Sequence, residues 1–265
     1  SWEENPPTMI DFAKRDVRWC QGNMQYASLL GLPGLLPLSR FQLAWAMLMF
    51  IGIPAWTLMI ALLPAAAYEA RAIADYPVGL AIGLYVAFFT MYLAPKIAGL
   101  LDAALTKGGV DSYGGSIRFA ISAVIELVFS FLQGAISTVR TTVFMVGLVF
   151  GKSVTWGGQS RDARGISWLT AIENFWPQTL FGVLVCGALY MISPTVLMWS
   201  LPLTIGYILA VPFAVVSSSP AVGRWLRDWG LCGIPEDFEP APEIEAVERR
   251  LVEPATGPSV QHQTA

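Results

Sequence analysis

The stretch FQLAWAMLMFIGIPAWTLMIALLP at residues 41–64 decides the fold class of this chain. It contains no charged residue, and a helix of this length rises far enough, at about 1.5 Å per residue, to cross roughly 30 Å of hydrocarbon. Pro54 lies in its middle and predicts a kink, because proline removes one hydrogen bond of the helix. The stretch therefore predicts a transmembrane helix.

Three further apolar runs predict more spans, at residues 77–95, 175–192 and 195–216. The last two are separated only by the tight Ser193-Pro194 turn, so they form a helical hairpin. The Lys and Arg residues that flank these runs place residues 1–40 and 96–118 on the cytosolic side, following the tendency of basic residues to stay inside.

Residues 119–150 are also mainly apolar, but they carry Glu126, Gln133 and Arg140. A lone charge deep in lipid is expensive, and a single crossing would put the following basic residues outside. We therefore predict a helix that lies in the interface, or a hairpin that returns to its starting face.

The composition supports an integral membrane protein. Of 265 residues, 55% are hydrophobic and 13% are charged, and the mean hydropathy is +0.56, which leaves too little polar surface for a soluble globule. The net charge of −3 provides no basic field, so nucleic acid is not an expected partner. The scattered Cys20, Cys186 and Cys232 suggest neither a disulfide framework nor a metal site.

These observations predict an all-α polytopic membrane protein with transmembrane helices and amphipathic interface helices. Residues 1–40 read as the end of a cytosolic domain with an interface helix, and 41–217 as the membrane region. Residues 218–235 then form a cytosolic segment after the membrane, and 236–265 a disordered cytosolic tail, since low hydrophobicity with high charge does not fold alone. The chain starts Ser-Trp-Glu-Glu, so we expect a fragment that lacks its N-terminal part.

A basic and aromatic cluster precedes the first span. Arg15 and Arg18 lie three residues apart and share a helix face, from which they can hold a diphosphate by bidentate hydrogen bonds. Trp19 offers a flat surface for a sugar ring. The pattern indicates a sugar-nucleotide site at a membrane surface. A positive flank with a tryptophan anchor beside a first transmembrane helix is the competing interpretation.

Arg15, Arg18 and Trp19 also match the Gln/Arg-x-x-Arg-Trp motif of processive family 2 glycosyltransferases, the superfamily of cellulose, chitin and hyaluronan synthases. The longer stretch KRDVRWCQGN at residues 14–23 resembles the glucosyltransferase H family, whose members make osmoregulated periplasmic glucans in Gram-negative bacteria. The stretches EENPP at 3–7, WGGQSRD at 156–162 and IPEDF at 234–238 are similar to that family as well.

This resemblance implies a function. It implies the C-terminal membrane portion of a hexosyltransferase that joins a GT-A domain to a membrane channel. The whole enzyme would transfer glucose from UDP-glucose to a growing β-1,2-glucan and export it through the bacterial inner membrane, with both termini of this chain cytosolic. Arg15 and Arg18 would bind the donor diphosphate, and Trp19 would stack on the acceptor.

The resemblance also implies what this chain lacks. The general base and a divalent cation, Mg²⁺ or Mn²⁺, belong to upstream residues in the superfamily, so we expect no catalytic or metal-binding residue here and no activity from the chain alone. Implied partners are UDP-glucose, the glucan, membrane lipids, acyl carrier protein and a periplasmic glucan-processing protein. The alternatives are a β-glucan synthase of other linkage, or a polytopic transporter or scaffold without chemistry.

The loop after residue 150 is a further candidate site. In cellulose-synthase-like enzymes a loop at this place, with a Val-Thr core and a nearby lysine, closes over the nucleotide. Lys152, Val154 and Thr155 look similar, although an ordinary basic loop at the lipid head groups explains them too.

Several single residues have a competing structural explanation. Trp45, Trp56 and Trp199 lie deep in predicted spans and are candidates for a sugar channel. Glu126 could hydrogen-bond a glucan, or pair with a nearby arginine. Asp11 and Asp16 read as solvated helix charges, since basic residues lie within about one turn of each.

Overall fold

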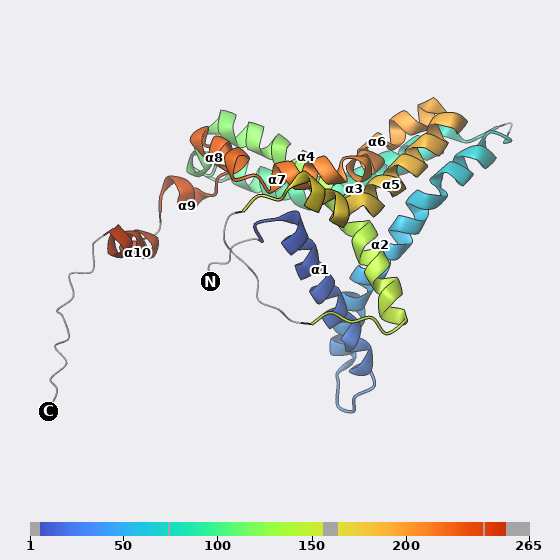
Figure 1. Cartoon of the computed structure of the whole chain (residues 1–265), viewed down its shortest axis with the longest axis horizontal. Helices are drawn as coiled ribbons and strands as arrows, with labels where there is room; N and C mark the ends of the chain where they lie inside the picture. The colour runs from blue at the N-terminus through green and yellow to red at the C-terminus, as the bar shows by residue number, and fades with distance from the viewer. Residues whose placement is uncertain (1–5, 74, 156–163, 241, 253–265) are drawn as a thin grey trace. The chain divides into compact units, whose positions relative to one another are not determined.

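The computed structural model describes residues 6–73, 75–155, 164–240 and 242–252, and every regular element in these ranges is a helix. The elements are α1 (Met9–Met24), η1 (Gln25–Ser28), α2 (Pro37–Ala70), α3 (Val78–Leu105), η2 (Asp111–Tyr113), α4 (Ser116–Val149), α5 (Trp168–Ile192), α6 (Pro194–Ile208), α7 (Ala210–Ser217), α8 (Pro220–Asp228), α9 (Pro235–Phe238) and α10 (Pro242–Val252) (Figure 1). The all-α prediction is confirmed.

Four helices, α2, α3, α4 and α5, are long and apolar enough to cross a membrane. The pair α6 and α7 meets the same criterion as one span, although the chain bends by 58° between the two helices. The prediction of a multi-pass membrane protein is confirmed on length and composition.

The helices run further than the predicted spans. α2 continues through Pro64 to Ala70, and α3 continues through Pro95 to Leu105. A proline inside a helix removes one hydrogen bond and bends the axis, but transmembrane helices tolerate it when the following residues keep helical geometry. Lys96 and Asp102 therefore lie on α3, beyond the predicted end of the span at residue 95.

Residues 119–150 form part of one continuous helix, α4, so the hairpin alternative is wrong. At least one of the polar groups that argued for a break has a partner within the helix. Glu126, for example, accepts a hydrogen bond of 3.0 Å from the Ser130 hydroxyl one turn later. α4 is more amphipathic than the other long helices, as expected of a helix with one face toward an interface or a protein core.

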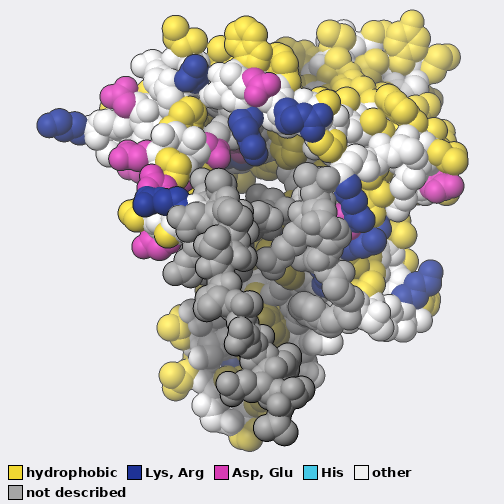
Figure 2. All heavy atoms as spheres, turned by 60° about the vertical axis from the view of Figure 1, so that its left-hand side comes forward, with side chains coloured by type: hydrophobic (Ala, Val, Ile, Leu, Met, Phe, Trp, Pro, Cys, Tyr) yellow, Lys and Arg dark blue, Asp and Glu magenta, His cyan; other side chains and the backbone are white. Residues whose placement is uncertain are grey.

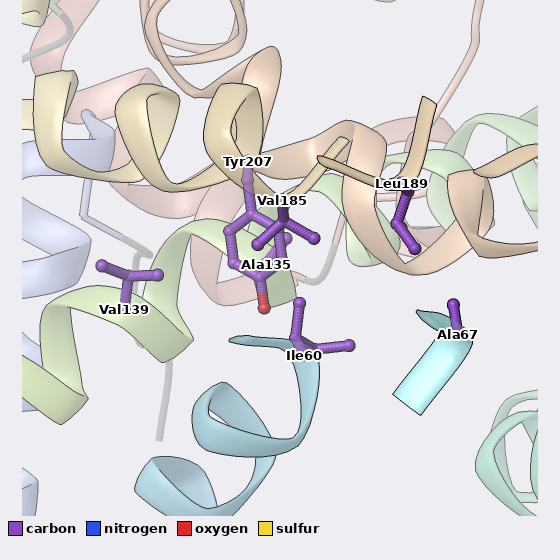
Figure 3. Packing of buried hydrophobic residues seen from close by; sticks show 7 residues of the cluster. All are labelled: Ile60, Ala67, Ala135, Val139, Val185, Leu189 and Tyr207. Carbon is purple, nitrogen blue, oxygen red and sulfur yellow. The ribbon is translucent and has the colours of Figure 1, made fainter. Parts of the chain in front are cut away.

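The first compact unit comprises residues 1–85 and 126–225, and α5 is its centre. α5 packs against α6, α7 and α2. Side chains from α2, α4, α5 and α6 form one buried cluster, in which Tyr207, Val185, Ala135 and Ile60 converge (Figure 3). The Tyr207 hydroxyl lies 3.0 Å from the Thr138 hydroxyl, which satisfies both groups inside the apolar cluster.

Two glycines allow the close helix contacts in this unit. A Cβ atom at Gly182 would lie 2.7 Å from the backbone nitrogen of Ile208, and one at Gly206 would lie 2.7 Å from the Cβ of Ala135. Small residues let helix backbones approach closely, which is the main source of packing energy between helices in lipid. α5, α6 and α4 therefore meet at positions where no side chain fits.

The second compact unit contains residues 86–125 and the chain from 226 onward. Gly114 has φ +80°, and the Phe238 ring lies where a Cβ atom at Gly114 would point, so glycine is required there for two reasons. The backbone N–H of Cys232 donates to the Ser122 hydroxyl at 2.8 Å. The unit thus joins the start of α4 to the segment that follows α8.

The C-terminal segment differs from the predicted tail. We expected disorder from residue 236, whereas α9 covers Pro235–Phe238 and α10 covers Pro242–Val252. Both helices begin with proline and have acidic residues in the first turn, which suits the helix dipole, and Arg249 pairs with Glu245 at 2.9 Å. Residues 253–265 lie outside the described part of the chain.

Large hydrophobic side chains cover much of the surface. Figure 2 shows hydrophobic side chains gathered over the upper and right-hand parts of the face that it draws. Large hydrophobic side chains that are at least half exposed include Trp45, Leu48, Met91 and Leu184. A soluble protein rarely exposes apolar area on this scale, so this surface matches contact with lipid.

Candidate functional site

Helix α1 carries the Arg-x-x-Arg-Trp motif, and its first turn shows why it begins where it does. Thr8 is the N-cap: its hydroxyl accepts a hydrogen bond from the Asp11 N–H at 3.2 Å and donates to the Asp11 carboxylate at 2.7 Å. The Thr8 side chain therefore caps the first turn of α1, and Asp11 in turn holds the Thr8 hydroxyl. It fixes the direction in which α1 leaves the preceding chain.

One face of α1 is buried. Met9, Ala13, Val17 and Cys20 recur at helical spacing and are nearly inaccessible. Met9 belongs to a second buried cluster with α4, α5 and α7 residues, which includes Phe175. The motif residues lie off this buried stripe, so packing orients them away from the core.

The Arg15 side chain is 20% exposed and contacts three side chains of its own helix. Its guanidinium carbon lies 4.5 Å from the centre of the Phe12 ring and 4.8 Å from that of Trp19, and its Nε lies 3.8 Å from an Asp16 carboxylate oxygen. Cation–π contacts of this kind restrain both partners. Arg15 therefore holds the Trp19 ring in addition to any contact with a ligand.

Arg18 and Trp19 reach the surface of α1. Trp19 is 54% exposed, and Arg18 is half-buried. The Asn23 side chain donates to the Trp19 carbonyl at 2.9 Å, which stabilises the last turn of the helix behind the ring. An exposed ring that contacts the Arg15 guanidinium, with Arg18 at the preceding position of the helix, can stack on a sugar and bind phosphate.

The loop that follows α4 lies against α1. The Gln21 side chain makes two hydrogen bonds to the Val154 backbone: its amide nitrogen donates to the Val154 carbonyl at 3.1 Å, and its amide oxygen accepts from the Val154 N–H at 2.8 Å. Lys152 and Thr155 are exposed on either side. The motif helix and the predicted gating residues are thus adjacent, although they are 133 positions apart in sequence.

A second link joins the other end of α1 to the same connection. Arg164 donates to the Asp11 carboxylate at 2.8 Å, and the Asp11 side chain is buried. Burial opposes ionisation of Asp11, but the hydrogen bonds from Thr8 and Arg164 outweigh it and hold the pKa below its usual value. The prediction of a solvated charge is wrong for Asp11, because the partner that buries it is 153 positions away.

Asp16 differs from the prediction as well. Its side chain is only 22% exposed, and burial raises its pKa to about 6 in spite of the nearby Arg15 guanidinium. Gln21, Asp11 and Arg164 were not singled out as functional by the sequence. The only signal that could have found Gln21 is its place in the motif stretch, two positions after Trp19.

The other candidates are dispersed. Trp45 is 58% exposed and stacks on Phe41, and Trp199 is 57% exposed, whereas Trp56 packs against the central cluster. Residues 156–163 of the connection, including Trp156, Gln159 and Arg161 of the family-like stretch, lie outside the described residues. Within the described ranges, no three His, Cys, Asp or Glu side chains lie together as a metal site would require.

These features define a multi-pass helical membrane protein in which α1, with its Arg-x-x-Arg-Trp motif, is hydrogen-bonded through Gln21 to the loop between α4 and α5. Among proteins of known name, this chain is similar to glucans biosynthesis glucosyltransferase H from three bacteria. It is 32% identical to the protein of Xanthomonas campestris pv. campestris (strain B100) over 259 residues, 91% of this chain and 39% of that relative. It is 30% identical to that of Ralstonia nicotianae over 95% of this chain and 31% of the relative.

The protein of Pseudomonas syringae pv. syringae is 28% identical over 96% of this chain and 33% of its own length. The chain therefore spans between about a third and two fifths of the length of these relatives. No family model matches the chain, and no solved structure does. The resemblance found in the motif stretch is confirmed over nearly the whole chain.

Proposed function

We propose that this chain is the membrane portion of a hexosyltransferase that transfers glucose from UDP-glucose to a growing β-1,2-glucan and passes the polymer through the bacterial inner membrane. The observation that carries the proposal is the placement of α1. Its Arg-x-x-Arg-Trp face lies beside the loop of Lys152, Val154 and Thr155, next to helices long enough to span a membrane, in a chain whose relatives are named glucosyltransferases.

Each motif residue has a role in this proposal. Arg18 reaches the surface and binds the donor diphosphate, since a guanidinium pairs with phosphate in a bidentate manner. Trp19 stacks its free ring face on the acceptor end of the glucan. Arg15 covers the other side of Trp19 and contributes charge to the diphosphate site, so part of its role is to position the ring.

The two links to α1 fit a site that assembles on binding. Gln21 holds Val154 through two hydrogen bonds, each of a strength that a ligand can replace, while the buried Asp11–Arg164 pair anchors the far end of the connection. Lys152 and Thr155 are exposed on either side of Val154, where they can contact the nucleotide.

A divalent cation, acyl carrier protein and a periplasmic glucan-processing protein belong to the proposal for the whole enzyme. The described residues of this chain do not fit a cation site, because they contain no cluster of suitable ligands. We therefore derive no step through the cation here. The general base is likewise assigned to no residue of this chain.

The test is a comparison of Trp19 and Arg18 variants in the full-length enzyme, in which this segment is joined to the rest of the protein. Trp19→Ala should lose most polymer formation, Trp19→Phe should keep part of it, and both should leave the apparent binding of UDP-glucose nearly unchanged. Arg18→Ala should reduce catalytic efficiency at least about tenfold, since hydrogen bonds to charged groups contribute roughly 1.5–3 kcal/mol each.

Polymer formation and UDP-glucose hydrolysis should be measured side by side on purified protein, per correctly inserted molecule. Normal polymer synthesis by Trp19→Ala would refute the acceptor role. No UDP-glucose-dependent glucan from the wild-type full-length protein would favour a transporter or scaffold, and a polymer of other linkage would favour a related β-glucan synthase.

The orientation is part of the same proposal, with both ends of the chain in the cytosol. In a cysteine-free background, a cysteine at Asp75 should react with an impermeant maleimide added outside, and one at Lys107 should not. The reverse pattern would show that the orientation is inverted.

A further inference from the structure

A cavity of about 470 Å³ lies among the end of α2, the start of α3 and the turn between α5 and α6, all within the first compact unit. Its walls are almost entirely apolar. This volume lies in the range of small-molecule sites, which combine mainly apolar walls with a few polar groups.

Apart from Tyr85, the polar residues of the cavity lie at the loop ends of the three elements. Along α2, Leu63 and Ala66 line the wall, and Arg71 follows directly after the last turn. Along α3, Tyr76 precedes the helix, and Ile82 lies inside it. The cavity therefore has a polar rim at the helix ends and an apolar interior.

α6 repeats this gradient. Ser193 and Thr195 lie at its first turn, and Val196 and Trp199 line the cavity further along. Because each element has its polar residues at its loop end, the rim is polar on three sides. A ligand that matches this pattern has one polar end and one apolar end.

Tyr85 and Trp199 close the inner end. The Tyr85 hydroxyl donates to the Trp199 carbonyl at 2.8 Å, and the two rings meet edge to face with centres 5.7 Å apart. The hydroxyl is thus already satisfied, and the pair presents ring surfaces to the cavity. A glucan would need polar partners along its whole length, because it carries hydroxyl groups along its whole length.

We propose that this cavity binds one acyl chain of a membrane phospholipid, whose phosphate lies against Arg71. Leu63 and Arg71 are two helical turns apart, about 12 Å along the axis, close to the roughly 15 Å half-thickness of the hydrocarbon core. Arg71 is exposed at the rim and can donate bidentately to phosphate, and the Ser193, Thr195 and Tyr76 hydroxyls lie at the same end.

The choice of a phospholipid follows from charge and setting. A fatty tail alone would leave Arg71 without a role, and a soluble anion would leave the apolar interior without one. The cavity lies beside helices whose outer surfaces are apolar, so the lipid needs no passage through water. The proposal does not depend on the enzymatic activity.

The experiment uses the whole chain reconstituted in phosphatidylcholine vesicles that contain a phosphatidylglycerol with a photoreactive diazirine on its acyl chain. After irradiation, crosslinks are mapped by mass spectrometry and normalised to the general labelling of exposed α4 residues. We expect the label to concentrate on α2 near Ala66 and on α6 near Trp199.

Two variants and their controls test the two halves of the site. Ala66→Trp fills the cavity and should reduce cavity labelling at least about fivefold, whereas Ala65→Trp, next to it on the exposed surface and not a lining residue, should leave it unchanged. Arg71→Ala should reduce labelling about tenfold, and Arg71→Lys should retain part of it.

Several results would overturn the proposal. Equal labelling in wild type, Ala66→Trp and Arg71→Ala would mean that only the general lipid layer was detected. A loss with Ala66→Trp but none with Arg71→Ala would show an apolar occupant without phosphate recognition. If Ala66→Trp does not fold, Ala81→Phe fills the cavity from α3 and replaces it in the same comparison.

Discussion

Replacing Gln21 with methionine should release the loop at Val154 from α1. Methionine has a similar length and shape, but it can neither donate to the Val154 carbonyl nor accept from its N–H. Both hydrogen bonds, of 3.1 and 2.8 Å, are therefore lost while the helix and its buried face are retained. The perturbation is confined to one side chain that contacts one backbone unit.

The magnitude follows from these two bonds. Each hydrogen bond contributes about 0.5–1.5 kcal/mol net, so together they favour the attached loop by about 1–3 kcal/mol. This corresponds to a change of about 5- to 150-fold in the ratio of attached to released loop. The Val154 amide should exchange its hydrogen faster by the same factor, because its N–H is the group that Gln21 protects.

The assay is hydrogen exchange measured by mass spectrometry on peptides that cover residues 148–155, with the protein in nanodiscs. Gln25→Met is the matched control, since Gln25 is exposed at the start of η1 and the same change there should leave Val154 exchange unaltered. An unchanged exchange rate in Gln21→Met would refute the view that Gln21 fastens this loop to α1.

Three further outcomes follow from the structure. Asp11→Asn removes the charge that pairs with Arg164 and should lower the free energy of unfolding by about 1–2 kcal/mol. This is less than a fully buried pair would contribute, because Arg164 is half exposed. Asp228→Asn, at an exposed position, is the control in thermal unfolding and should change little. Asp16 has a pKa of about 6 in the folded protein against 3.8 in the unfolded chain, so its contribution to stability is present below pH 4 and is lost as the pH rises through about 6. The unfolding free energy should therefore fall by up to about 3 kcal/mol across this range. Asp16→Asn should remove this fall in denaturation curves measured at each pH. Gly206→Ala should cost about 1–3 kcal/mol, because its new methyl would lie 2.7 Å from Ala135, whereas Gly187→Ala has open space and should cost nothing; equal unfolding temperatures for the two glycine variants would contradict the packing described here.

The membrane helices show which features follow from local sequence and which do not. The apolar runs at 41–64, 77–95 and 175–192 predicted long apolar helices correctly, because the cost of exposing polar groups to lipid depends on composition within one helix. The run at 195–216 was predicted as one span, whereas the structure bends it by 58° between α6 and α7. The hairpin within 119–150 was wrong for a related reason. Charged residues such as Glu126 were judged as if isolated, whereas Ser130 on the next turn satisfies that carboxylate.

The sequence by itself determined the all-α class, the multi-pass character and the motif at Arg15, Arg18 and Trp19, since these depend on residue type and near-neighbour spacing. Only the tertiary structure placed Gln21 against Val154 and Asp11 against Arg164. These contacts join residues 133 and 153 positions apart, and no local pattern encodes which distant backbone group a glutamine will meet. Packing of α1 on its buried face decides that, because it brings the motif helix and the loop before α5 to the same place.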